Sequence, residues 1–421
     1  MVTFTSFVTR DYMNYSLPKT KTNTARKKEI FVNMKIWFWT KKLYYKFLDT
    51  FFCKKRVVFI SFNGKQYSDN PKYISKKLHE LSPKTKQIWF FVNPDKMRED
   101  IPDYIQCKKL TSRRLLRYLH TSRVWVDNDY LVYTSFATRY PKRKDQLFIE
   151  TWHGDRGLKK CFYDVKGFRA PEGVFTLQTP GFCDYLLTGS TFAEKVVRSM
   201  FRYKGKLLTC GYPRNDCLIN RDEEAIKKVK QKLDVSEDTK ILLYAPTFKG
   251  KIGDKMTEHI DFKKIVEILE EKTNQNWVVA YRPHHIGKDT EIPSCTRFFY
   301  TNKLFEDMAE ILQATDLLIT DYSSCAGDFI LTGKPVILYI NDYDAYVNSD
   351  RGLHFEIEKT PFLFAKDNEE LQEIVKDLTA EKAIENCDEL KRFYGCTETG
   401  HSAETVANLI LENLYHKKEK Q

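Results

Sequence analysis

Three features that would place the chain in a specialised class are absent from its sequence. Nowhere do about 18 uncharged apolar residues follow one another, so no membrane-spanning helix is predicted. The ten cysteines form no CxxC pair and no dense cluster, which argues against a zinc site or disulfide scaffold and favours reduced thiols. The N-terminal stretch lacks a basic region followed by an apolar one, so no signal peptide is predicted. We therefore expect the protein to stay on the side of the membrane where it is made.

Length and charge indicate a globular protein of two or three domains with a basic leader. The chain has 421 residues, of which 14% are aromatic, too many for a disordered protein. Residues 1–56 hold 13 Lys and Arg against 3 Asp and Glu, a net charge of +10. The other 365 residues hold 56 Lys and Arg against 54 Asp and Glu, a net charge of +2. A near-neutral body does not suit binding to nucleic acid over a wide surface, so no nucleic-acid partner is predicted.

Residues 31–52 predict a basic amphipathic helix within this leader. Its polar stripe carries Lys35, Lys42, Lys46 and Asp49, and aromatic and aliphatic side chains cover most of the remaining surface. Tryptophan and tyrosine suit the interface between membrane and water, and each cation near an anionic leaflet contributes about 1 kcal/mol. Two interpretations stay open: the helix binds an anionic membrane surface, or it docks on the protein's own surface.

From residue 56 onward, short apolar runs alternate with helical stretches, which predicts parallel sheets covered by helices on both faces. The predicted strands are 57–62, 88–92, 123–126, 146–151, 182–188 and 206–209, then 241–244, 277–281, 317–320 and 336–339. Two α/β halves that meet near residues 211–220 would place a ligand site in the cleft between them. The predicted domains are a leader (1–55), two α/β domains (56–210 and 211–395) and a C-terminal helix with a tail (396–421).

Four polar clusters each follow a predicted strand, and the first is TWHGDRGLKK at residues 151–160. His153 suits a general base because the pKa of imidazole lies near neutrality, although a histidine in a glycine-rich turn can also be structural. Asp155 would either orient His153 or repel the phosphates of a substrate. Arg156 and Lys159 supply cations for an anionic acceptor or phosphate.

The other three clusters also suit phosphate. Thr247 lies in the segment YAPTFK, where a strand ends in a turn that contains proline. The alternative interpretation is that these residues only form the turn and bind no ligand. Arg282 opens RPHH and offers a planar donor fork, whereas the adjacent histidines lack the spacing of a metal site. Asp321, Ser323 and Ser324 open a helix whose N-terminus attracts phosphate, unless they form only a plain helix cap.

Together these blocks resemble the CDP-glycerol glycerophosphotransferase family of teichoic-acid primases and polymerases. The resemblance runs from about residue 57 to about residue 414. The segments that carry it are SFNGKQYSDNPK (61–72), TWHGDRGLKK (151–160), CGYPRNDCL (210–218), LYAPTFKG (243–250), RPHH (282–285), ITDYSSCAGDFILTGKPVILY (319–339) and RGLHFE (351–356).

The resemblance implies a fold, a reaction and a set of site residues. It implies two Rossmann-like domains of the GT-B type, with the acceptor on the N-terminal domain and CDP-glycerol on the C-terminal one. An acceptor hydroxyl would attack the β-phosphorus of CDP-glycerol and release CMP, with no further cofactor. His153 and His284 match catalytic positions, and Gly211 and Pro213 match a block between the domains. The residues matched to the donor pyrophosphate are Arg282, Asp321, Ser323, Ser324 and Thr247.

The resemblance further implies a peripheral protein on the cytoplasmic face of the membrane, with a lipid-linked or glycan acceptor. One departure concerns Asp155 and Arg156, because the commoner family form has Thr-Pro after His-Gly. The acceptor is therefore open between a main-chain teichoic acid and a capsular or other cell-wall polymer. Two alternatives also stay open: a transferase on the same fold that uses a nucleotide-sugar or CDP-ribitol, and a non-catalytic, membrane-recruited protein that binds polyanions.

Overall fold

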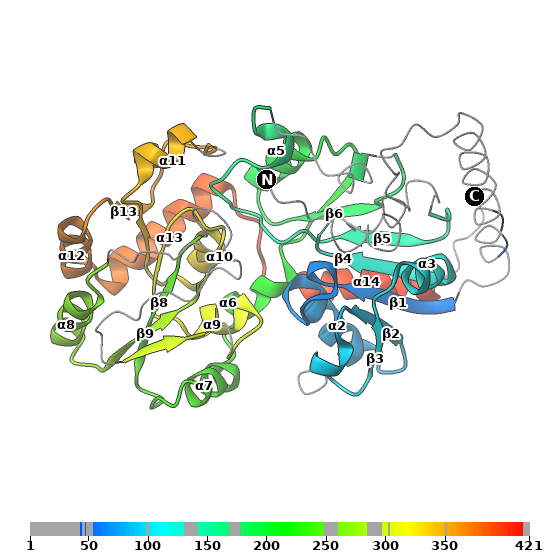
Figure 1. Cartoon of the computed structure of the whole chain (residues 1–421), viewed down its shortest axis with the longest axis horizontal. Helices are drawn as coiled ribbons and strands as arrows, with labels where there is room; N and C mark the ends of the chain where they lie inside the picture. The colour runs from blue at the N-terminus through cyan, green and yellow to red at the C-terminus, as the bar shows by residue number, and fades with distance from the viewer. Residues whose placement is uncertain are drawn as a thin grey trace, which may run out of the picture.

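Two parallel β-sheets organise the chain, one in each half (Figure 1). The computed structural model describes residues 43, 47, 54–97, 101–129, 142–167, 177–178, 180–247, 260–283, 297–301, 304–349 and 352–415. In this part of the chain no helix combines the length and the apolar character needed to span a bilayer. Leu43 and Phe47 are the described residues of the predicted leader helix, and both are helical and exposed. The rest of that helix lies outside the described residues.

The first sheet has seven parallel strands in the order β3-β2-β1-β4-β5-β6-β7. Apolar runs such as VVFI form the strands because both faces of the sheet are covered by helices, which leaves little water on either side. The strands are β1 (Lys54–Ile60), β2 (Lys86–Phe91), β3 (Ile105–Lys109), β4 (Ser122–Asp127), β5 (Leu147–Glu150), β6 (Tyr185–Thr188) and β7 (Lys206–Thr209). The helices of this half are α2 (Asp69–Leu81), α3 (Ser112–Thr121) and α5 (Thr191–Met200), with 3-10 turns η1 (Phe62–Gly64), η2 (Pro94–Met97) and η5 (Phe162–Asp164).

The second sheet has six parallel strands in the order β10-β9-β8-β11-β12-β13. The strands are β8 (Lys240–Ala245), β9 (Trp277–Tyr281), β10 (Phe298–Tyr300), β11 (Leu317–Thr320), β12 (Val336–Tyr339) and β13 (Leu363–Ala365). Its helices are α7 (Glu223–Lys232), α8 (Phe262–Thr273), α9 (Met308–Ala314), α10 (Cys325–Phe329), α11 (Tyr343–Ser349), α12 (Asn368–Asp377) and α13 (Ala380–Tyr394), with 3-10 turns η7 (Ile330–Thr332) and η8 (Ile357–Lys359). Side-chain caps begin several of them: Asp261, Asp307 and Thr379 accept hydrogen bonds from the first turns of α8, α9 and α13.

Both sheets share one topology. Counted from its own first strand, the second sheet has the order 3-2-1-4-5-6, and the first sheet has the same order with a seventh strand added after the sixth. This is the doubly wound order, in which ligands bind where the chain reverses direction across the sheet. The reversal lies between β1 and β4 in the first sheet and between β8 and β11 in the second. The carboxyl ends of these four strands are therefore where a ligand site is expected.

The two halves are connected twice along the chain. The η6 turn (Pro213–Asn215) and α6 (Asp216–Asn220) lead from the first sheet to the second. After α13 the chain returns, and α14 (Ser402–Tyr415) packs its buried face, which includes Val406 and Ile410, into the core of the first half. In Figure 1 the red helix α14 lies along the strands of the first sheet, away from the other C-terminal helices.

The prediction of an α/β fold with two parallel sheets is confirmed. Most predicted strands match within a few residues, and β7, β9, β11 and β12 match at both ends. The strands β3, β10 and β13 were not predicted. The boundaries of the predicted domains stay predictions. The return of α14 means that the first half is built from two separate stretches of chain, whereas the second half is one continuous stretch.

Candidate active site

The turn after β5 carries His153 and is held by hydrogen bonds from two neighbouring elements. Thr151 donates from its backbone N and from Oγ1 to the carbonyl oxygen of Asp127, at 2.8 and 3.1 Å, which ties the end of β5 to the end of β4. Asn70 of α2 donates to the carbonyl oxygen of Trp152 at 3.0 Å. Trp152 has a φ of 53°, a left-handed conformation that is costly for a bulky residue. Such strain persists where the surrounding structure fixes it, and functional sites are common places for it.

The surroundings of His153 determine which ring nitrogen carries the proton. Nδ1 lies 2.7 Å from the carbonyl oxygen of Asn128, and a carbonyl only accepts, so Nδ1 donates and Nε2 keeps its lone pair. The ring packs between Phe62 and Trp152, with centroid distances of 5.3 and 3.9 Å. Burial and the charge of Arg214 lower the pKa of His153 to about 4, although the hydrogen bond to Asn128 opposes the shift. His153 is therefore a neutral base at pH 7.

The η1 turn forms one wall of this site. Phe62, Asn63 and Gly64 have φ angles of 43°, 56° and 76°, so three consecutive residues are left-handed. The backbone N of Phe62 donates to Oδ1 of Asn128 at 2.8 Å. Asn128 therefore holds the η1 turn with its side chain and His153 with its backbone. This contact lies between β1 and β4, where the first sheet reverses direction.

In the second half, the turn after β11 lies against the turn that carries His153. A Cβ atom placed on Gly154 would lie 3.6 Å from Oγ of Ser324, and one on Gly157 would lie 3.6 Å from Cβ of Ser324. Both distances are ordinary van der Waals contacts, so the two glycines bring the backbone of the first half close to Ser324 of the second. Ser323 and Ser324 are half-buried, which leaves part of each side chain accessible.

Asp321 and Thr247 are bound to one another. Thr247 donates from its backbone N at 2.9 Å and from Oγ1 at 2.8 Å to the carboxylate of Asp321, and both residues are buried. The pair connects the ends of β8 and β11, where the second sheet reverses direction. This placement favours a positioning role for Asp321, because a second anion would repel a pyrophosphate. The hydroxyls of Ser323 and Ser324 are better placed to donate to phosphate.

Arg282 follows β9 and is fixed by neutral groups. Its two terminal nitrogens donate to the carbonyl oxygens of Phe305 and Glu306, at 2.7 and 2.9 Å. Burial lowers the pKa of Arg282, but an arginine stays charged at any pH near neutrality. Because carbonyl groups orient the guanidinium without cancelling its charge, Arg282 suits an anionic ligand. His284, predicted as a second catalytic residue, lies outside the described residues.

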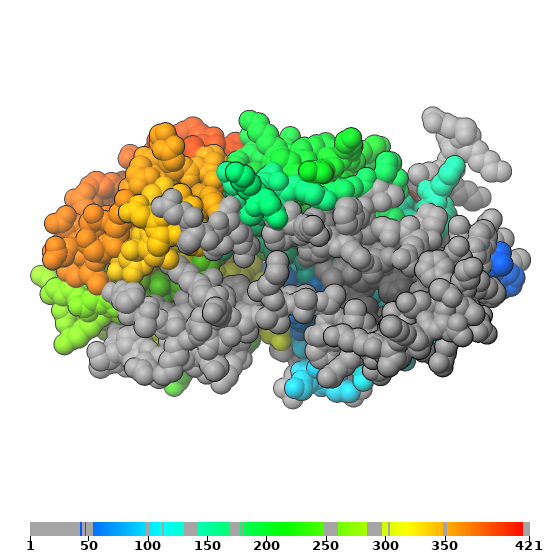
Figure 2. Space-filling view, turned by 45° about the horizontal axis from the view of Figure 1, so that its top comes forward, coloured from blue at the N-terminus to red at the C-terminus, as the bar shows by residue number. Residues whose placement is uncertain are grey.

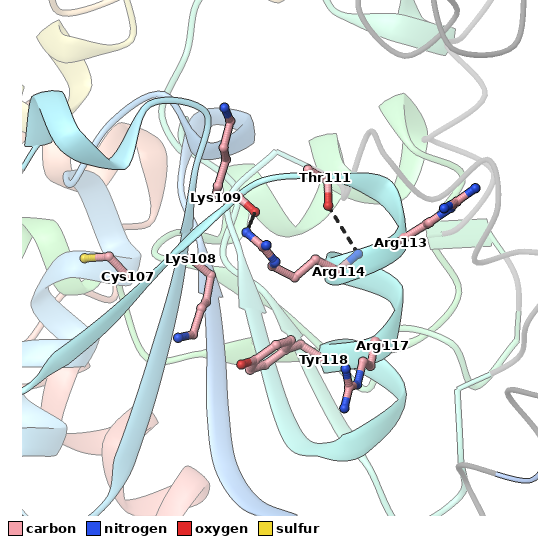
Figure 3. Close-up of a pocket in the computed structure, with 8 residues that line it drawn as sticks. All are labelled: Cys107, Lys108, Lys109, Thr111, Arg113, Arg114, Arg117 and Tyr118. Carbon is pink, nitrogen blue, oxygen red and sulfur yellow. Dashed lines mark hydrogen bonds between the residues drawn. The ribbon is translucent and has the colours of Figure 1, made fainter.

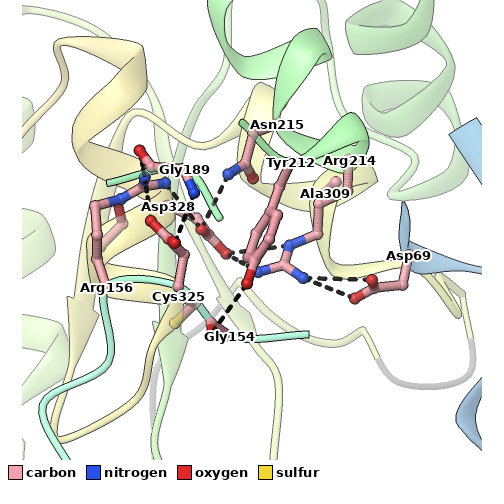
Figure 4. A network of polar contacts seen from close by, with 12 residues as sticks. Asp69, Gly154, Arg156, Gly189, Tyr212, Arg214, Asn215, Ala309, Cys325 and Asp328 are labelled. Carbon is pink, nitrogen blue, oxygen red and sulfur yellow. Dashed lines mark hydrogen bonds and ion pairs between the residues drawn. The ribbon is translucent and has the colours of Figure 1, made fainter. Parts of the chain in front are cut away.

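Asp155 and Arg156 are part of a buried network between the halves (Figure 4). The Arg156 side chain is 0% exposed, and it donates to a carboxylate oxygen of Asp155 at 2.7 Å and to the carbonyl oxygen of Gly327 at 2.7 Å. It also pairs with Asp328 at 3.3 Å and with Glu398 at 3.1 Å. Asp155 accepts from the backbone N of Gly189 at 2.9 Å. This placement favours a structural role over the predicted contact with acceptor or phosphate.

A second buried arginine extends the network toward α2. Arg214 donates to Asp69 at 3.1 Å and to Asp328 at 2.9 Å, so it joins one acidic residue from each half (Figure 4). Asn215 donates to Asp328 at 3.2 Å and to Glu398 at 2.8 Å. Burial raises the pKa of Glu398 to about 7, the charge of Asp155 adds to the shift, and Arg156 opposes it.

Gly211 and Pro213, predicted to lie between the domains, are found beside this network. Gly211 has a φ of 91°, and a Cβ atom there would lie 2.3 Å from Oε2 of Glu398, so only glycine leaves room for that carboxylate. Pro213 opens η6 and is buried. Glu398 accepts a hydrogen bond from the backbone N of Tyr212 at 2.9 Å.

Lys159 lies in a third contact between the halves. It pairs with Leu353 in an antiparallel bridge, and the backbone N of Lys160 donates to the carbonyl oxygen of Gly352 at 3.0 Å. In Figure 2 the orange-yellow surface of the C-terminal half meets the green surface of the N-terminal half along this side. The backbone of Lys159 is thus part of the interface, while its side chain is half-buried.

Lys72 provides a further ion pair across the halves. From α2 it reaches Asp307 at 3.1 Å and Glu310 at 2.6 Å in the second half, and the lysine and Asp307 are buried. Burial alone would raise the pKa of Asp307, but the ion pair with Lys72 outweighs it and lowers that pKa. The pair therefore stays ionised at neutral pH.

Several residues of the site were missed by sequence reasoning. Arg214 lies in the segment CGYPRNDCL, but no sequence pattern indicates that it joins Asp69 to Asp328. Glu398 follows no predicted strand, and no sequence pattern indicates that it meets Arg156. Asp129 had a usable signal, because it ends the segment DND, which begins with the last residue of β4. Asn63 donates to it, and burial together with the charge of Asp127 raises the pKa of Asp129 to about 8. Within the described residues, no group of three acidic, histidine or cysteine side chains could hold a metal ion.

The fold and the site define a two-sheet α/β protein in which the turn of a neutral histidine lies against a turn with two serine hydroxyls, and a guanidinium follows another strand of the second sheet. Residues 43–412 match the family model described as CDP-glycerol:poly(glycerophosphate) glycerophosphotransferase. The chain therefore belongs to that family, which confirms the predicted resemblance.

Named relatives agree with this assignment. The chain is 30% identical over 380 residues to a teichoic acid poly(glycerol phosphate) polymerase of Bacillus spizizenii, covering 85% of this chain and 92% of the relative. It is 28% identical to a teichoic acid glycerol-phosphate transferase of Staphylococcus aureus, covering 87% of this chain and 96% of the relative. It spans about half, 49%, of a longer Bacillus subtilis polymerase. A solved structure of the wall teichoic acid polymerase TagF matches with a TM-score of 0.75 and 25% identity, over 94% of this chain and 100% of the other.

Proposed function

We propose that the chain transfers glycerol phosphate from CDP-glycerol to a hydroxyl group of a teichoic-acid chain or a related cell-wall or capsular polymer, and releases CMP. The single observation that carries the proposal is the juxtaposition of His153 with the turn of Ser323 and Ser324 across the cleft. Membership of the family and the polymerases and transferases among the relatives supply the donor and the class of acceptor.

In this mechanism Nε2 of His153 accepts the proton of the acceptor hydroxyl. The acceptor oxygen then forms a bond to the β-phosphorus of CDP-glycerol, and the bond from that phosphorus to the oxygen of CMP breaks, so that CMP leaves with the electron pair. Arg282 and the hydroxyls of Ser323 and Ser324 would stabilise negative charge on the phosphates. Phosphoryl transfer depends mainly on positioning and charge stabilisation, which this set of groups can supply.

We also propose that the two sheets are the acceptor and donor halves of a GT-B arrangement. The N-terminal half supplies the base, and the C-terminal half supplies Arg282 and the serine turn at the carboxyl ends of its strands. Support comes from the strand order 3-2-1-4-5-6 that both sheets contain, because ligands bind at the switch point of such a sheet.

The experiment is CMP release from CDP-glycerol in the presence of a glycerol-phosphate acceptor. His153→Asn should lower the rate by roughly 100- to 10,000-fold, the range for loss of a general base. The matched control is His401→Asn, because His401 is exposed just before α14. A His153→Asn variant as active as His401→Asn would refute the assignment of the base.

A donor panel separates the alternatives. CDP-glycerol, CDP-ribitol and UDP-sugars are compared as donors for the same acceptor. We expect turnover with CDP-glycerol, whereas turnover with a UDP-sugar alone would assign the chain to sugar transfer. Failure of every donor with every acceptor, together with retained binding of polyanions, would favour the non-catalytic interpretation.

We further propose that the protein works at the cytoplasmic face of a membrane as a peripheral protein, held by its basic leader. Support comes from the net charge of +10 on residues 1–56 against +2 on the rest of the chain. The polymer acceptor would then be lipid-linked.

A further inference from the structure

A cavity of about 630 Å³ outside the cleft is lined mainly by basic side chains (Figure 3). It lies where β3 ends and α3 begins, and its cations are Lys108, Lys109, Arg113, Arg114 and Arg117. Lys109, Arg113, Arg114 and Arg117 are exposed. No acidic residue lines this cavity among the described residues. A solvated helix face commonly mixes charges of both signs, so the single sign here needs a different explanation.

These cations lack the acidic partners that the buried cations between the two halves have. Within the ranges that the structure describes, none of the five forms an ion pair, whereas Lys72, Arg156 and Arg214 each pair with two or more acidic residues. The body of the chain has a net charge of only +2, so five cations at one cavity are a local concentration. Such a concentration attracts an anion with several charges.

One end of the cavity, where β3 ends and α3 begins, lies at the same edge of the first sheet as His153. All strands of this sheet are parallel, so the carboxyl end of β3 and that of β5 face the same side. β5 is four strands away from β3 in the sheet order, which corresponds to about 19 Å. A flexible chain with several charged units can span this distance, whereas a mononucleotide in the cleft has no reason to reach the cavity.

Contacts between residues connect the cavity to the base. A Cβ atom on Gly64 would lie 3.2 Å from the Leu110 side chain, so the loop that follows β3 packs on the η1 turn. The same turn presents Phe62 to His153, with a centroid distance of 5.3 Å. The cavity, the η1 turn and the base are therefore connected by packed residues of the N-terminal half.

We propose that this cavity binds phosphate groups of the growing acceptor chain, at units that precede the hydroxyl being extended. The inference rests on the proposed function, because a poly(glycerol phosphate) acceptor supplies one anionic phosphodiester in every repeat. Guanidinium groups bind phosphate oxygens with paired hydrogen bonds, which suits Arg113, Arg114 and Arg117. A nucleotide base would need a free aromatic face, but Arg56 covers the ring of Tyr118 at 4.3 Å.

The test compares acceptors of two lengths, one glycerol-phosphate unit and a synthetic chain of several units. In Arg113→Ala/Arg117→Ala we expect the KM for the long acceptor to rise roughly tenfold, since each exposed ion pair contributes modestly. The KM for the one-unit acceptor and for CDP-glycerol should stay within about twofold. The matched control is the double variant Arg113→Lys/Arg117→Lys, which keeps both positive charges. It should retain most of the affinity for the long acceptor.

A second measurement follows binding of purified poly(glycerol phosphate) by fluorescence anisotropy without a donor. The alanine variant should bind the chain more weakly, whether or not turnover is measured. If wild-type protein binds the chain but releases no CMP, the proposed function fails and the subsite stands. If the alanine variant binds the chain as well as wild type, the subsite is refuted. Loss of binding to phosphatidylglycerol vesicles with unchanged chain binding would assign the cavity to lipid headgroups instead, and would also overturn the proposal.

Discussion

His153 is kept in one protonation state by the atoms around it. The carbonyl oxygen of Asn128 requires a proton on Nδ1, and burial lowers the pKa of the ring from 6.5 to about 4. The neutral base should therefore persist well below pH 6. We expect kcat/KM for CMP release, which reports the free enzyme, to stay level from about pH 8 to about pH 5.5 and to fall toward pH 4.

Phe62→Ala supplies the internal control for this profile. The Phe62 ring contributes to the burial of His153, so its removal admits water and should move the acidic limb upward toward 6.5. Intrinsic fluorescence at each pH would confirm that both proteins remain folded. A wild-type acidic limb already centred near pH 6.5 would contradict the lowering of the His153 pKa by its surroundings.

The pKa of Asp129 is shifted in the opposite direction to that of His153, and the expected consequence is a pH-dependent stability. Burial and the nearby Asp127 raise its pKa from 3.8 to about 8, so the folded state holds the proton more tightly than the unfolded state. Its contribution to stability is then fully present below about pH 4 and is lost as the pH rises toward 8. We expect Asp129→Asn to be more stable than wild type at pH 8, by about 1–2 kcal/mol, and nearly equal at pH 4.5.

Urea unfolding at the two pH values measures this difference. Asp103→Asn is the matched control, because Asp103 is exposed on the same half. Its free energy of unfolding should differ from that of wild type by no more than about 0.5 kcal/mol at either pH. If Asp129→Asn is less stable than wild type at pH 8, then the ionised carboxylate stabilises the turn after β4, and the predicted direction of the stability difference is wrong.

Candidate site residues that directly follow a strand could be proposed from the sequence. The buried network of charged residues between the halves could not. His153, Arg282 and Ser324 were located because each follows an apolar run at the carboxyl edge of a sheet. The same reasoning placed Asp155 and Arg156 as contacts for a substrate. The local sequence does not show that both side chains are buried. In the structure they form ion pairs and hydrogen bonds with one another and with residues far along the chain, such as Gly327 and Glu398.

Among the elements, apolar strands were predicted well and polar edge strands were missed. WVVAY and LLIT are short, continuous apolar runs, which a sheet covered on both faces requires. β3 has the sequence IQCKK and lies at the edge of its sheet, where lysines are tolerated and protect against aggregation. β10 and β13 have only three residues each and also lie at edges. The position of α14 depends on tertiary packing and left no local signal.

The helix α10 reaches the first half only because it contains Gly327. A Cβ atom there would lie 2.4 Å from Cβ of Arg156 and 2.5 Å from its carbonyl oxygen, and a backbone atom cannot rotate away. We expect Gly327→Ala to lower the free energy of unfolding by about 1–3 kcal/mol and to reduce turnover, because it pushes the serine turn away from His153. Urea unfolding and CMP release measure the two effects.

Gly157→Ala is the matched control for that substitution. It lies at the same contact between the halves, but its Cβ atom would come no closer than 3.6 Å to Ser324, an ordinary packing distance. Its stability should remain within about 0.5 kcal/mol of wild type. Equal stability of the two alanine variants would mean that α10 and Arg156 are not in close contact in solution.

The relative position of the two halves follows from three buried cations. Lys72 and Arg156 each pair with acidic residues of the opposite half, and Arg214 joins Asp69 to Asp328. Breaking such a buried pair by removing one partner costs about 3–5 kcal/mol, because the other charge stays buried alone. The halves are thereby held with the turn of His153 against the serine turn, and the site is assembled by the interface itself.

The charge of the whole chain is divided between a neutral body, which carries the site, and a leader with a net charge of +10. If the leader holds the protein at a membrane, then reversing its charges should release the protein while leaving the site intact. For Lys41→Glu/Lys42→Glu/Lys46→Glu in the full chain we expect binding to phosphatidylglycerol vesicles to weaken by at least roughly 100-fold, at about 1 kcal/mol for each cation removed. Turnover of a water-soluble acceptor should not change.

The matched control places the same change of net charge on the exposed surface of the second half, with Lys263→Glu/Lys264→Glu/Lys376→Glu. A leader effect requires weaker vesicle binding in the first variant and wild-type binding in the control. Equal losses would mean that binding follows net charge alone. Wild-type binding in both variants would mean that the leader helix packs on the protein's own surface, because charges that never face the lipid cannot affect attachment. The basic charge of the leader would then serve packing within the protein, and not attachment to the membrane that carries the acceptor.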